Sequence, residues 1–402
     1  MIASMPRDAE RTHSDGYDPA MDISMRDRRA RTVTTGVVAA MLVVGLSGCS
    51  LLGVGGPAPS SSPTPTSSPS TTAATDGVRF TERPDQAGMP ACTSVLPAGL
   101  TARLVPAVAD DDLLTEQEHM DPSAMAAPAS GGLTCSIDNG VAAMDSVYPG
   151  TQGDPMRNAV TATVLPDASE ALDTFLGQDS SGSGPVWCAA TDAARLLCQA
   201  DVHAGSAWLS VGLERVQDAT DVTPEGMRDR FQALVAHATT AVQDSPLGSA
   251  EVPHETGDPG PSTCIATRVD TVTSTPLVDT NAGTDWHDDI SWVALERAGA
   301  DVCDFRPASE QGYATVAARY GTLPKGSWAV RARIEAGLVD AADRIQLDGL
   351  GAHDAAFRTC DDTLCTVDVV HGGDWTRYLL ATSVAPDTSA AIESWATSSF
   401  DR

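Results

Sequence analysis

Two segments of the chain, CQADVHAGSAW at residues 198–208 and CTVDVVHGGDW at residues 365–375, share the pattern C-x-x-D-V-x-x-G-x-x-W in one register. The cysteines after residue 49 repeat in the same way, because corresponding members of two groups of four lie 172, 168, 172 and 167 residues apart. The groups are Cys92, Cys135, Cys188 and Cys198, then Cys264, Cys303, Cys360 and Cys365. Self-similarity at a nearly constant offset indicates an internal duplication. The sequence therefore predicts two copies of one structural unit.

The shared motif places an aspartate, a glycine and a tryptophan at matching positions of both copies: Asp201, Gly205 and Trp208, then Asp368, Gly372 and Trp375. We interpret all six as structural. An aspartate beside a glycine turn commonly accepts backbone hydrogen bonds, and a tryptophan on a strand is more often a core residue than a platform for a sugar. His203 and His371 also lie in the motif, but one position out of register, which argues against a shared ligand role.

The periodicity of each copy predicts strands and helices in a similar order. Residues 159–165 (AVTATVL) read as a strand, followed by a short helix that Asp167 and Glu170 open as a capping box. In the second copy, residues 327–335 (SWAVRARIE) alternate apolar and polar side chains and predict a strand, with a weaker helix over 336–345. A closing helix is expected over 223–242 and again over 387–400. We therefore predict an α+β fold of two duplicated domains, each an antiparallel sheet with helices packed on one face.

Composition divides the chain further. Residues 1–24 are polar and fit no element of this scheme, so we interpret them as a misassigned or disordered N-terminal extension. Residues 25–48 have the basic start, apolar run and small residues of a signal peptide. Residues 49–77 are rich in Ser, Thr and Pro and predict an extended, solvated tether. The first repeat domain is expected at 78–245, a linker at 246–261 and the second repeat domain at 262–402.

The signal ends in the stretch VVGLSGCSLLG at residues 43–53, in which a lone cysteine follows a short apolar run. Leu46-Ser47-Gly48-Cys49 resembles the lipobox of bacterial lipoproteins. That resemblance implies cleavage before Cys49, diacylglycerol on its sulfur and attachment of the protein to the membrane through this lipid. A transmembrane anchor and plain secretion are the alternatives, although the run is short of the roughly 20 apolar residues that a span needs.

With Cys49 assigned to lipid, eight cysteines remain for disulfides. Cys360 and Cys365 flank four residues, a length suited to a hairpin whose paired strands bring the side chains together. Cys188 and Cys198 occupy the same place in the first copy. The predicted pairs are therefore Cys188–Cys198, Cys360–Cys365, Cys92–Cys135 and Cys264–Cys303. The alternative is buried free thiols, which an export signal makes less favourable.

The net charge of −29 excludes nucleic acid and anionic membrane surfaces as partners of the globular part, since both require a cationic face. Metal ions, basic peptides and uncharged glycans stay open. No G-x-S-x-G, H-E-x-x-H, P-loop or G-x-G-x-x-G motif occurs. The acidic clusters at residues 110–112 and 286–289 lack the alternating spacing of a calcium loop, so we read them as solvated loops. We predict no cofactor, no metal site and no catalytic residue.

A lipobox, a Ser/Thr/Pro tether and small disulfide-bonded α+β domains together resemble the uncharacterised envelope lipoproteins of actinobacteria. The layout is more distantly similar to the extracellular sensor domains of mycobacterial serine/threonine kinases. The resemblance implies a protein on the outer face of the cell membrane that binds an envelope ligand or partner as a sensory module. A structural or adaptor lipoprotein is the first alternative, and an envelope enzyme built from distant residues is the second.

Overall fold

The computed structural model describes residues 75–86, 88–105, 121–138, 158–178, 186–190, 195–216, 223–248, 268–279, 289–309 and 316–398. All of these residues belong to one compact unit. The predicted signal peptide, Cys49, Cys264 and the acidic cluster at residues 110–112 lie outside the described residues, as does most of the cluster at 286–289.

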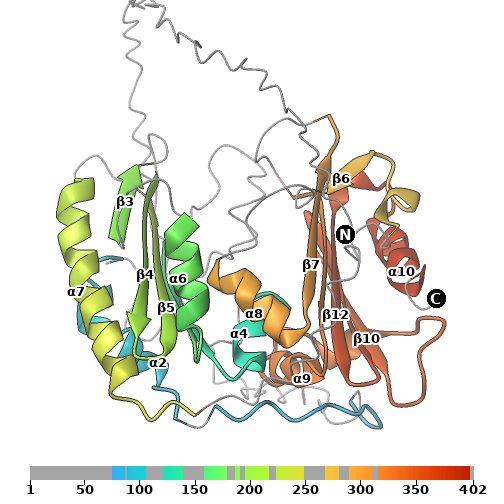
Figure 1. Ribbon diagram of the computed structural model, residues 1–402. Helices are drawn as coiled ribbons and strands as arrows, with labels where there is room; N and C mark the ends of the chain where they lie inside the picture. The colour runs from blue at the N-terminus through green and yellow to red at the C-terminus, as the bar shows by residue number, and fades with distance from the viewer. Residues whose placement is uncertain are drawn as a thin grey trace, which may run out of the picture. The chain divides into compact units, whose positions relative to one another are not determined.

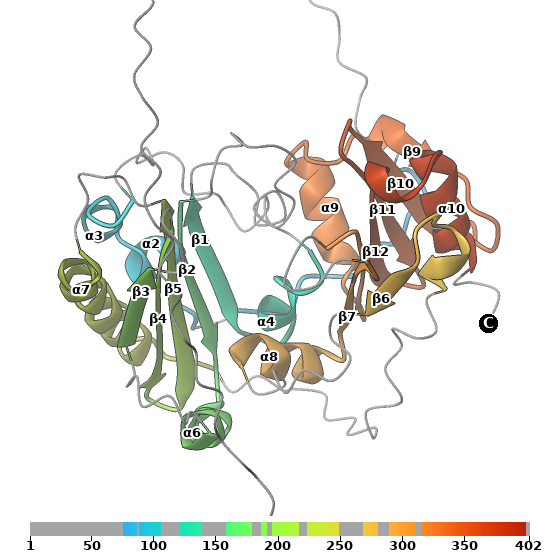
Figure 2. The same cartoon turned by 90° about the horizontal axis from the view of Figure 1, so that it is seen from above.

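The first copy forms a five-stranded antiparallel sheet with the strand order β1-β2-β5-β4-β3 (Figures 1 and 2). The strands are β1 (Leu133–Asp138), β2 (Ala159–Leu165), β3 (Val186–Ala190), β4 (Arg195–Ala204) and β5 (Ala207–Val216). Strand β2 is the one that the sequence predicted over the same residues. Its valines at 160 and 164 are buried on one face, while Thr161 and Thr163 point to the other and are half-buried.

The second copy forms a seven-stranded antiparallel sheet with the order β6-β7-β8-β12-β11-β10-β9. The strands are β6 (Leu277–Asp279), β7 (Asp301–Pro307), β8 (Ala318–Leu323), β9 (Arg344–Ile345), β10 (Ala355–Cys360), β11 (Leu364–His371) and β12 (Asp374–Ala381). The run β7-β8-β12-β11-β10 repeats the order of the first sheet, and β6 and β9 extend it at both edges. The predicted α+β class with two antiparallel sheets is confirmed.

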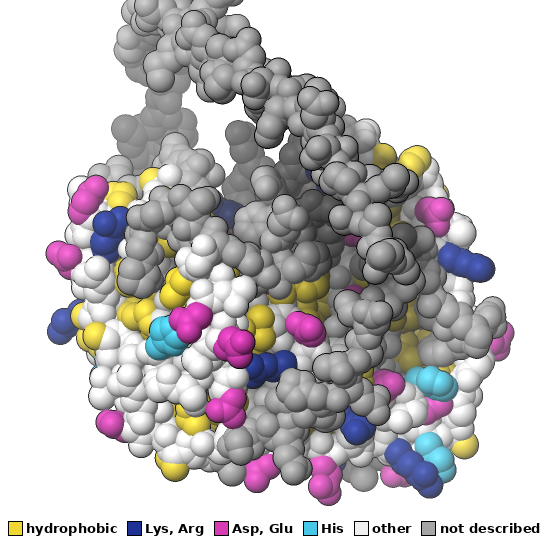
Figure 3. All heavy atoms as spheres, viewed as in Figure 1, with side chains coloured by type: hydrophobic (Ala, Val, Ile, Leu, Met, Phe, Trp, Pro, Cys, Tyr) yellow, Lys and Arg dark blue, Asp and Glu magenta, His cyan; other side chains and the backbone are white. Residues whose placement is uncertain are grey.

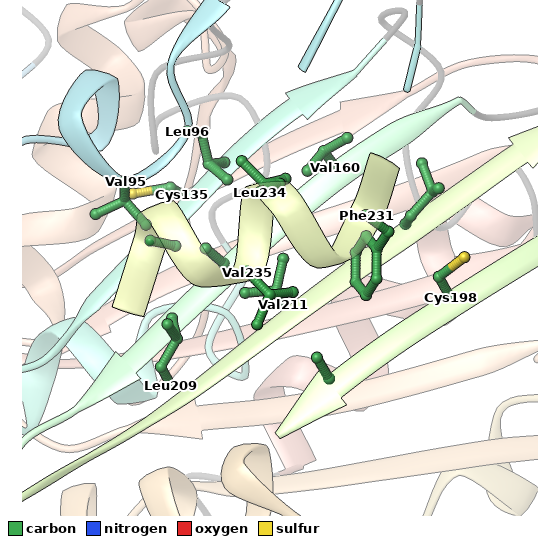
Figure 4. Packing of buried hydrophobic residues seen from close by; sticks show 14 of the residues in the cluster. Val95, Leu96, Cys135, Val160, Cys198, Leu209, Val211, Phe231, Leu234 and Val235 are labelled. Carbon is green, nitrogen blue, oxygen red and sulfur yellow. The ribbon is translucent and has the colours of Figure 1, made fainter. Parts of the chain in front are cut away.

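Helices lie on both faces of the first sheet, not on one as expected. On one face, α7 (Pro224–Gln243) packs its apolar stripe, including Phe231 and Leu234, against valines and leucines of the strands (Figure 4). The short helices α2 (Cys92–Val95) and α3 (Ala98–Thr101) contact α7. Helix α6 (Ser169–Gln178) lies on the opposite face (Figure 1). Its Leu172 belongs to a buried cluster with Trp208.

The second sheet is also covered on both faces, as Figure 2 shows for α9 and α10. Helix α10 (Thr388–Ser398) buries Trp395 against Phe305 and Tyr378. Helix α9 (Ser327–Glu335) packs Trp328 and other side chains on the other face.

Helix α9 occupies the residues that we predicted as a strand, and that prediction is wrong. The counterpart of β2 is β8, which begins nine residues before α9. The alternation was misleading because Arg333, expected in solvent, is only 7% exposed. Trp328, Ala329, Val330, Arg333 and Ile334 are all buried, a pattern that suits a deeply packed helix. The weak helix predicted over 336–345 is also absent, since that stretch holds a single 3-10 turn (Ala341–Asp343) and β9.

The two copies share apolar clusters. Helix α4 (Ala126–Ala129) from the first copy contacts α8 (Ile290–Ala298) from the second, and together they join Trp208 and Leu165 to Ile290 and Leu295 in one buried group. Met125 packs with Leu323, Trp328 and Trp375 of the second copy. Each copy therefore contributes side chains to the core of the other.

Three disulfides occur in the described chain: Cys92–Cys135, Cys188–Cys198 and Cys360–Cys365. They are three of the four predicted pairs. The second and third join residues that face each other directly in the β3–β4 and β10–β11 ladders. The pairing of Cys264 with Cys303 stays a prediction, because Cys264 lies outside the described residues.

Candidate functional site

The repeated motif builds the same buried pair in both copies. The indole Nε1 of Trp208 donates a hydrogen bond of 2.9 Å to Oδ1 of Asp201, and Trp375 does the same to Asp368 at 2.9 Å. Both tryptophans are fully buried, as expected. The aspartates were expected to accept from backbone amides, whereas these bonds come from the indoles. The motif therefore ties two neighbouring strands together across the sheet and is structural.

The motif glycines form the hairpin turns beside these pairs. Gly205 has φ of +69° and Gly372 has φ of +60°, a conformation that costs little only for residues without a Cβ.

The histidines of the motif have separate partners. His203 contacts Asp173 of α6 at 3.0 Å, while His371 contacts Asp354 at 2.9 Å. The two histidines therefore contact aspartates from different segments of the chain, and the absence of a shared ligand role stays a prediction.

Beyond the motif, one face of the second sheet carries a charged cluster that we call the arginine face: Asp304, Arg306, Arg319, Asp368 and Arg377. Cross-strand register places Asp304 beside Arg319 and Asp368 beside Arg377. Arg306 follows Asp304 by two residues on β7, so it belongs to the same face. Arg319 forms a two-point ion pair with Asp304, with Nη2 of the arginine 2.7 Å from Oδ2.

Asp368 lies between two arginines. Its Oδ2 is 3.8 Å from Nε of Arg333 on α9, and its Oδ1 is 3.7 Å from Nε of Arg377. Asp368 is 2% exposed, so this ion pairing occurs out of bulk water. Burial, together with the neighbouring charge of Arg377, lowers the pKa of Arg333 to about 10. The carboxylates present therefore do not offset the full cost of burying this guanidinium.

The corresponding face of the first sheet is mostly uncharged. We call it the hydroxyl face, and its residues are Thr134, Ser136, Thr161, Thr163 and Ser210. The match between copies follows from their pairing, because Leu165 pairs with Trp208 as Leu323 pairs with Trp375. Ser136, Thr161 and Ser210 thus correspond to Asp304, Arg319 and Arg377, and Asp138 corresponds to Arg306. By the same offset Arg333 corresponds to Phe175, whose ring lies 5.3 Å from that of Trp208.

One segment, Asp121–Ala124, contacts both faces. Asp121 Oδ2 lies 3.5 Å from Nη1 of Arg319 on the arginine face. Pro122 packs against Gly321 of β8, where an added Cβ would lie 3.1 Å from the proline ring. The carbonyl of Ala124 accepts a hydrogen bond from Thr134 on the hydroxyl face. The two polar faces therefore flank the same segment.

Asp121 is charged at neutral pH. Burial by itself would raise the pKa of this carboxyl, but Arg319, the Ser123 hydroxyl and the Ala124 amide outweigh burial and hold the pKa below its usual value.

Asp289, the described end of the acidic cluster at 286–289, has a pKa shifted in the opposite direction. It caps α8 by accepting from the Trp292 amide at 2.9 Å, and burial raises its pKa. It is a capping residue in this structure.

No three metal-ligating side chains come together among the described residues. Within the same residues, no helix is long and apolar enough to cross a membrane. No family model, curated protein or solved structure matches the chain.

The sequence carries one signal for the arginine face. Aligning the two motifs places Ser210 against Arg377, two residues after each tryptophan. Arg319 and Arg333 were out of reach, because the strand and the helix that carry them were assigned to the wrong residues. The candidate site is thus the pair of polar sheet faces on either side of Asp121–Ala124.

Proposed function

We propose that the chain is a lipid-anchored extracytoplasmic binding module of the bacterial cell envelope, which binds its ligand between the hydroxyl face and the arginine face. The proposal rests on the polar side chains that the two sheet faces carry. The same face of a repeated sheet bears polar groups in both copies, beyond the area that α6 or α9 covers with apolar side chains. A face used only for packing would be apolar throughout, because burying polar groups has a free-energy cost.

The three disulfides support the extracytoplasmic part of the proposal, since such bonds persist in oxidising compartments. Cys49 supports the lipid anchor, because its context resembles a lipobox. The acidic side chains in Figure 3 are spread over the visible face among basic and uncharged groups, as suits an exported protein surrounded by water.

A binding role is favoured over an adaptor role by the distribution of large apolar side chains. Among the described residues, the exposed large hydrophobic side chains are Leu176 and Val278, on separate elements. Protein-docking surfaces usually present contiguous apolar patches. The described surface offers polar groups for a ligand more readily than an apolar patch for a protein.

The proposal is tested on the full chain, produced with its own signal in a bacterial host and extracted from membranes in mild detergent. Native mass spectrometry should detect a bound small molecule in addition to the lipid. Thr163→Val, which removes a hydroxyl from the proposed surface, should lower the bound fraction. Thr239→Val on the outer helix α7 is the matched control and should leave it unchanged.

A second measurement covers ligands that are lost during purification. An extract of envelope small molecules should slow backbone hydrogen exchange in β2, β5 and β12, which carry the two faces. Absence of a bound species, together with unchanged exchange in these strands, would contradict the proposed function.

A further inference from the structure

One row of side chains crosses all five strands of the first sheet on the face opposite α7. We call it the polar row, and its members, in the order of the strands, are Ser136, Thr161, Gly212, Gln199 and Trp187. The alternate residues Val160, Val211 and Cys198 pack beneath α7 on the other face (Figure 4). Because neighbouring strands lie about 4.8 Å apart, the row is about 19 Å long, which exceeds the length of one sugar ring.

Trp187 ends the row on the edge strand β3, and it differs from the other described tryptophans. Each of those belongs to a buried apolar cluster or packs against one: Trp208, Trp292, Trp328, Trp375 and Trp395. Trp187 is half-buried, joins none of these clusters, and its indole nitrogen has no hydrogen-bond partner among the described residues. An aromatic side chain of this kind offers a flat apolar surface with a polar N–H group at its rim.

The hydroxyl groups in and beside the row also have no partner within the described parts of the chain. This holds for Thr161, Thr163 and Ser210, all of which are half-buried. The hydroxyl oxygen of Thr161 lies over the backbone of Gly212, where an added Cβ would be 2.7 Å from it. The glycine therefore lets this hydroxyl group lie over the middle strand, where it can donate and accept hydrogen bonds.

The buried pair of the repeat orients the amide of the row. Gln199 Nε2 donates a hydrogen bond of 3.0 Å to Oδ2 of Asp201, whose Oδ1 accepts from Trp208. Since the amide nitrogen faces Asp201, the amide oxygen is left as an acceptor for a ligand hydroxyl group. A side chain fixed in this way loses little conformational entropy when a ligand binds.

The second copy shows that the fold does not require this row. Its corresponding residues are Asp304, Arg319, Leu379, Thr366 and Thr359. Arg319 and Asp304 bond to each other there, and a buried leucine replaces the glycine. No aromatic residue corresponds to Trp187, although the strand order is the same. The combination of indole, amide and hydroxyl groups is therefore specific to the first copy.

We propose that the polar row binds an uncharged oligosaccharide. One sugar ring stacks on Trp187, and hydroxyl groups of the following rings bond to Gln199, Thr161 and Ser136. An aromatic surface beside a few fixed polar groups is the usual composition of a small-molecule site, and no side chain of the row is ionisable. This inference rests on the proposed function, because it names the ligand class of the hydroxyl face.

The test is titration of the full chain, extracted in a detergent without a sugar headgroup, and followed by calorimetry. The neutral probes are maltotetraose, cellotetraose and mannotetraose, and the acidic probe is tetragalacturonate. At least one neutral tetrasaccharide should bind about tenfold or more tightly than tetragalacturonate, because the row offers no charge to an acidic sugar.

Two variants locate the bound sugar on the row. Trp187→Ala should weaken the best neutral probe about 10- to 100-fold, as for other rings that stack on an aromatic side chain, whereas Trp187→Tyr should keep most of the affinity. Thr161→Val keeps the shape but removes the hydroxyl group, and should weaken the same probe about 3- to 10-fold. It carries the test if Trp187→Ala does not fold. Thr239→Val on α7 is the control and should bind like the wild-type chain.

Three results would overturn the inference: no binding of any neutral tetrasaccharide, tighter binding of tetragalacturonate, or binding that Trp187→Ala and Thr161→Val both leave unchanged. None of them decides the proposed function, which is judged by native mass spectrometry and hydrogen exchange with ligands of any class.

Discussion

Trp375 and Asp368 form a buried hydrogen bond, 2.9 Å from the indole nitrogen to the carboxylate oxygen, and Trp208 repeats it with Asp201 at the same distance. In each case the two residues are seven positions apart and belong to paired strands. The pair survives in both copies although the chemistry around it has diverged. It is therefore the shared centre of the repeat, beside which the second copy has Arg319 and Arg377 where the first has Thr161 and Ser210.

The invariant pair should matter for stability in both copies. Trp208→Phe keeps most of the apolar volume but removes the donor, which leaves a buried carboxylate with one partner fewer. We expect a loss of about 1–3 kcal/mol in the free energy of unfolding. Urea denaturation followed by circular dichroism measures it, with half-buried Trp187→Phe as the control. A loss equal to that of the control would show that the hydrogen bond contributes nothing.

The disulfides should stabilise the chain in the order of the loops that they close. Their sequence separations are 43, 10 and 5 residues for Cys92–Cys135, Cys188–Cys198 and Cys360–Cys365. The loop-entropy model then gives about 4, 3 and 2 kcal/mol. Double Cys→Ala variants of each pair, unfolded in urea, test this order. A reversed order would mean that strain or residual structure in the unfolded chain dominates.

Acid should weaken the contact between Asp121 and the arginine face. The pKa of Asp121 is lower in the folded chain than its ordinary value of 3.8. Ionised Asp121 therefore stabilises the fold at pH values above 3.8, and this stabilisation is lost as the pH falls through the lowered pKa of the folded chain. Asp121→Asn should remove part of the decrease in melting temperature below about pH 4. Exposed Asp270→Asn should leave the decrease unchanged, and an identical effect of both variants would contradict the assignment.

Arg333 should stabilise the fold through its contact with the buried carboxylate of Asp368. Its pKa of about 10 reflects a charge that burial disfavours, and Phe175 holds the corresponding place in the first copy. We expect Arg333→Phe to lower the free energy of unfolding by about 1–3 kcal/mol, because it leaves the buried carboxylate of Asp368 with one cationic partner fewer.

The control is Arg331→Phe, on the exposed side of the same helix. It should change the free energy of unfolding by little. A free energy of unfolding of Arg333→Phe equal to that of the wild-type chain would show that the contact between Arg333 and Asp368 contributes nothing to stability.

Cys49 should carry the lipid. Metabolic labelling with an alkyne fatty acid should mark the wild-type chain, and Cys49→Ala should lose the label and change its distribution between membrane and soluble fractions. Persistent label on Cys49→Ala would place the acyl group elsewhere or exclude the lipobox assignment.

The sequence by itself determined the duplication, the α+β class and the residues that form three of the disulfides. These features depend on spacing along the chain, and spacing is directly readable. Cys360 and Cys365 are one hairpin turn apart, so local geometry was enough to pair them. The β2 strand was also predictable, because one of its faces is apolar and the other is not.

Tertiary structure decided what spacing does not encode. SWAVRARIE alternates like a strand, yet it folds as α9, whose Trp328, Val330 and Ile334 are buried against Leu323 and Trp375 of the second sheet. Such contacts between distant residues cannot be seen in a local pattern. The same holds for Asp121, which reaches Arg319 almost 200 residues away. The polar faces arise from strands that are distant in sequence, so their chemistry emerges only when the sheets assemble. The periodicity of a sequence shows which side chains are apolar, whereas the fold determines which charged side chains lie close together.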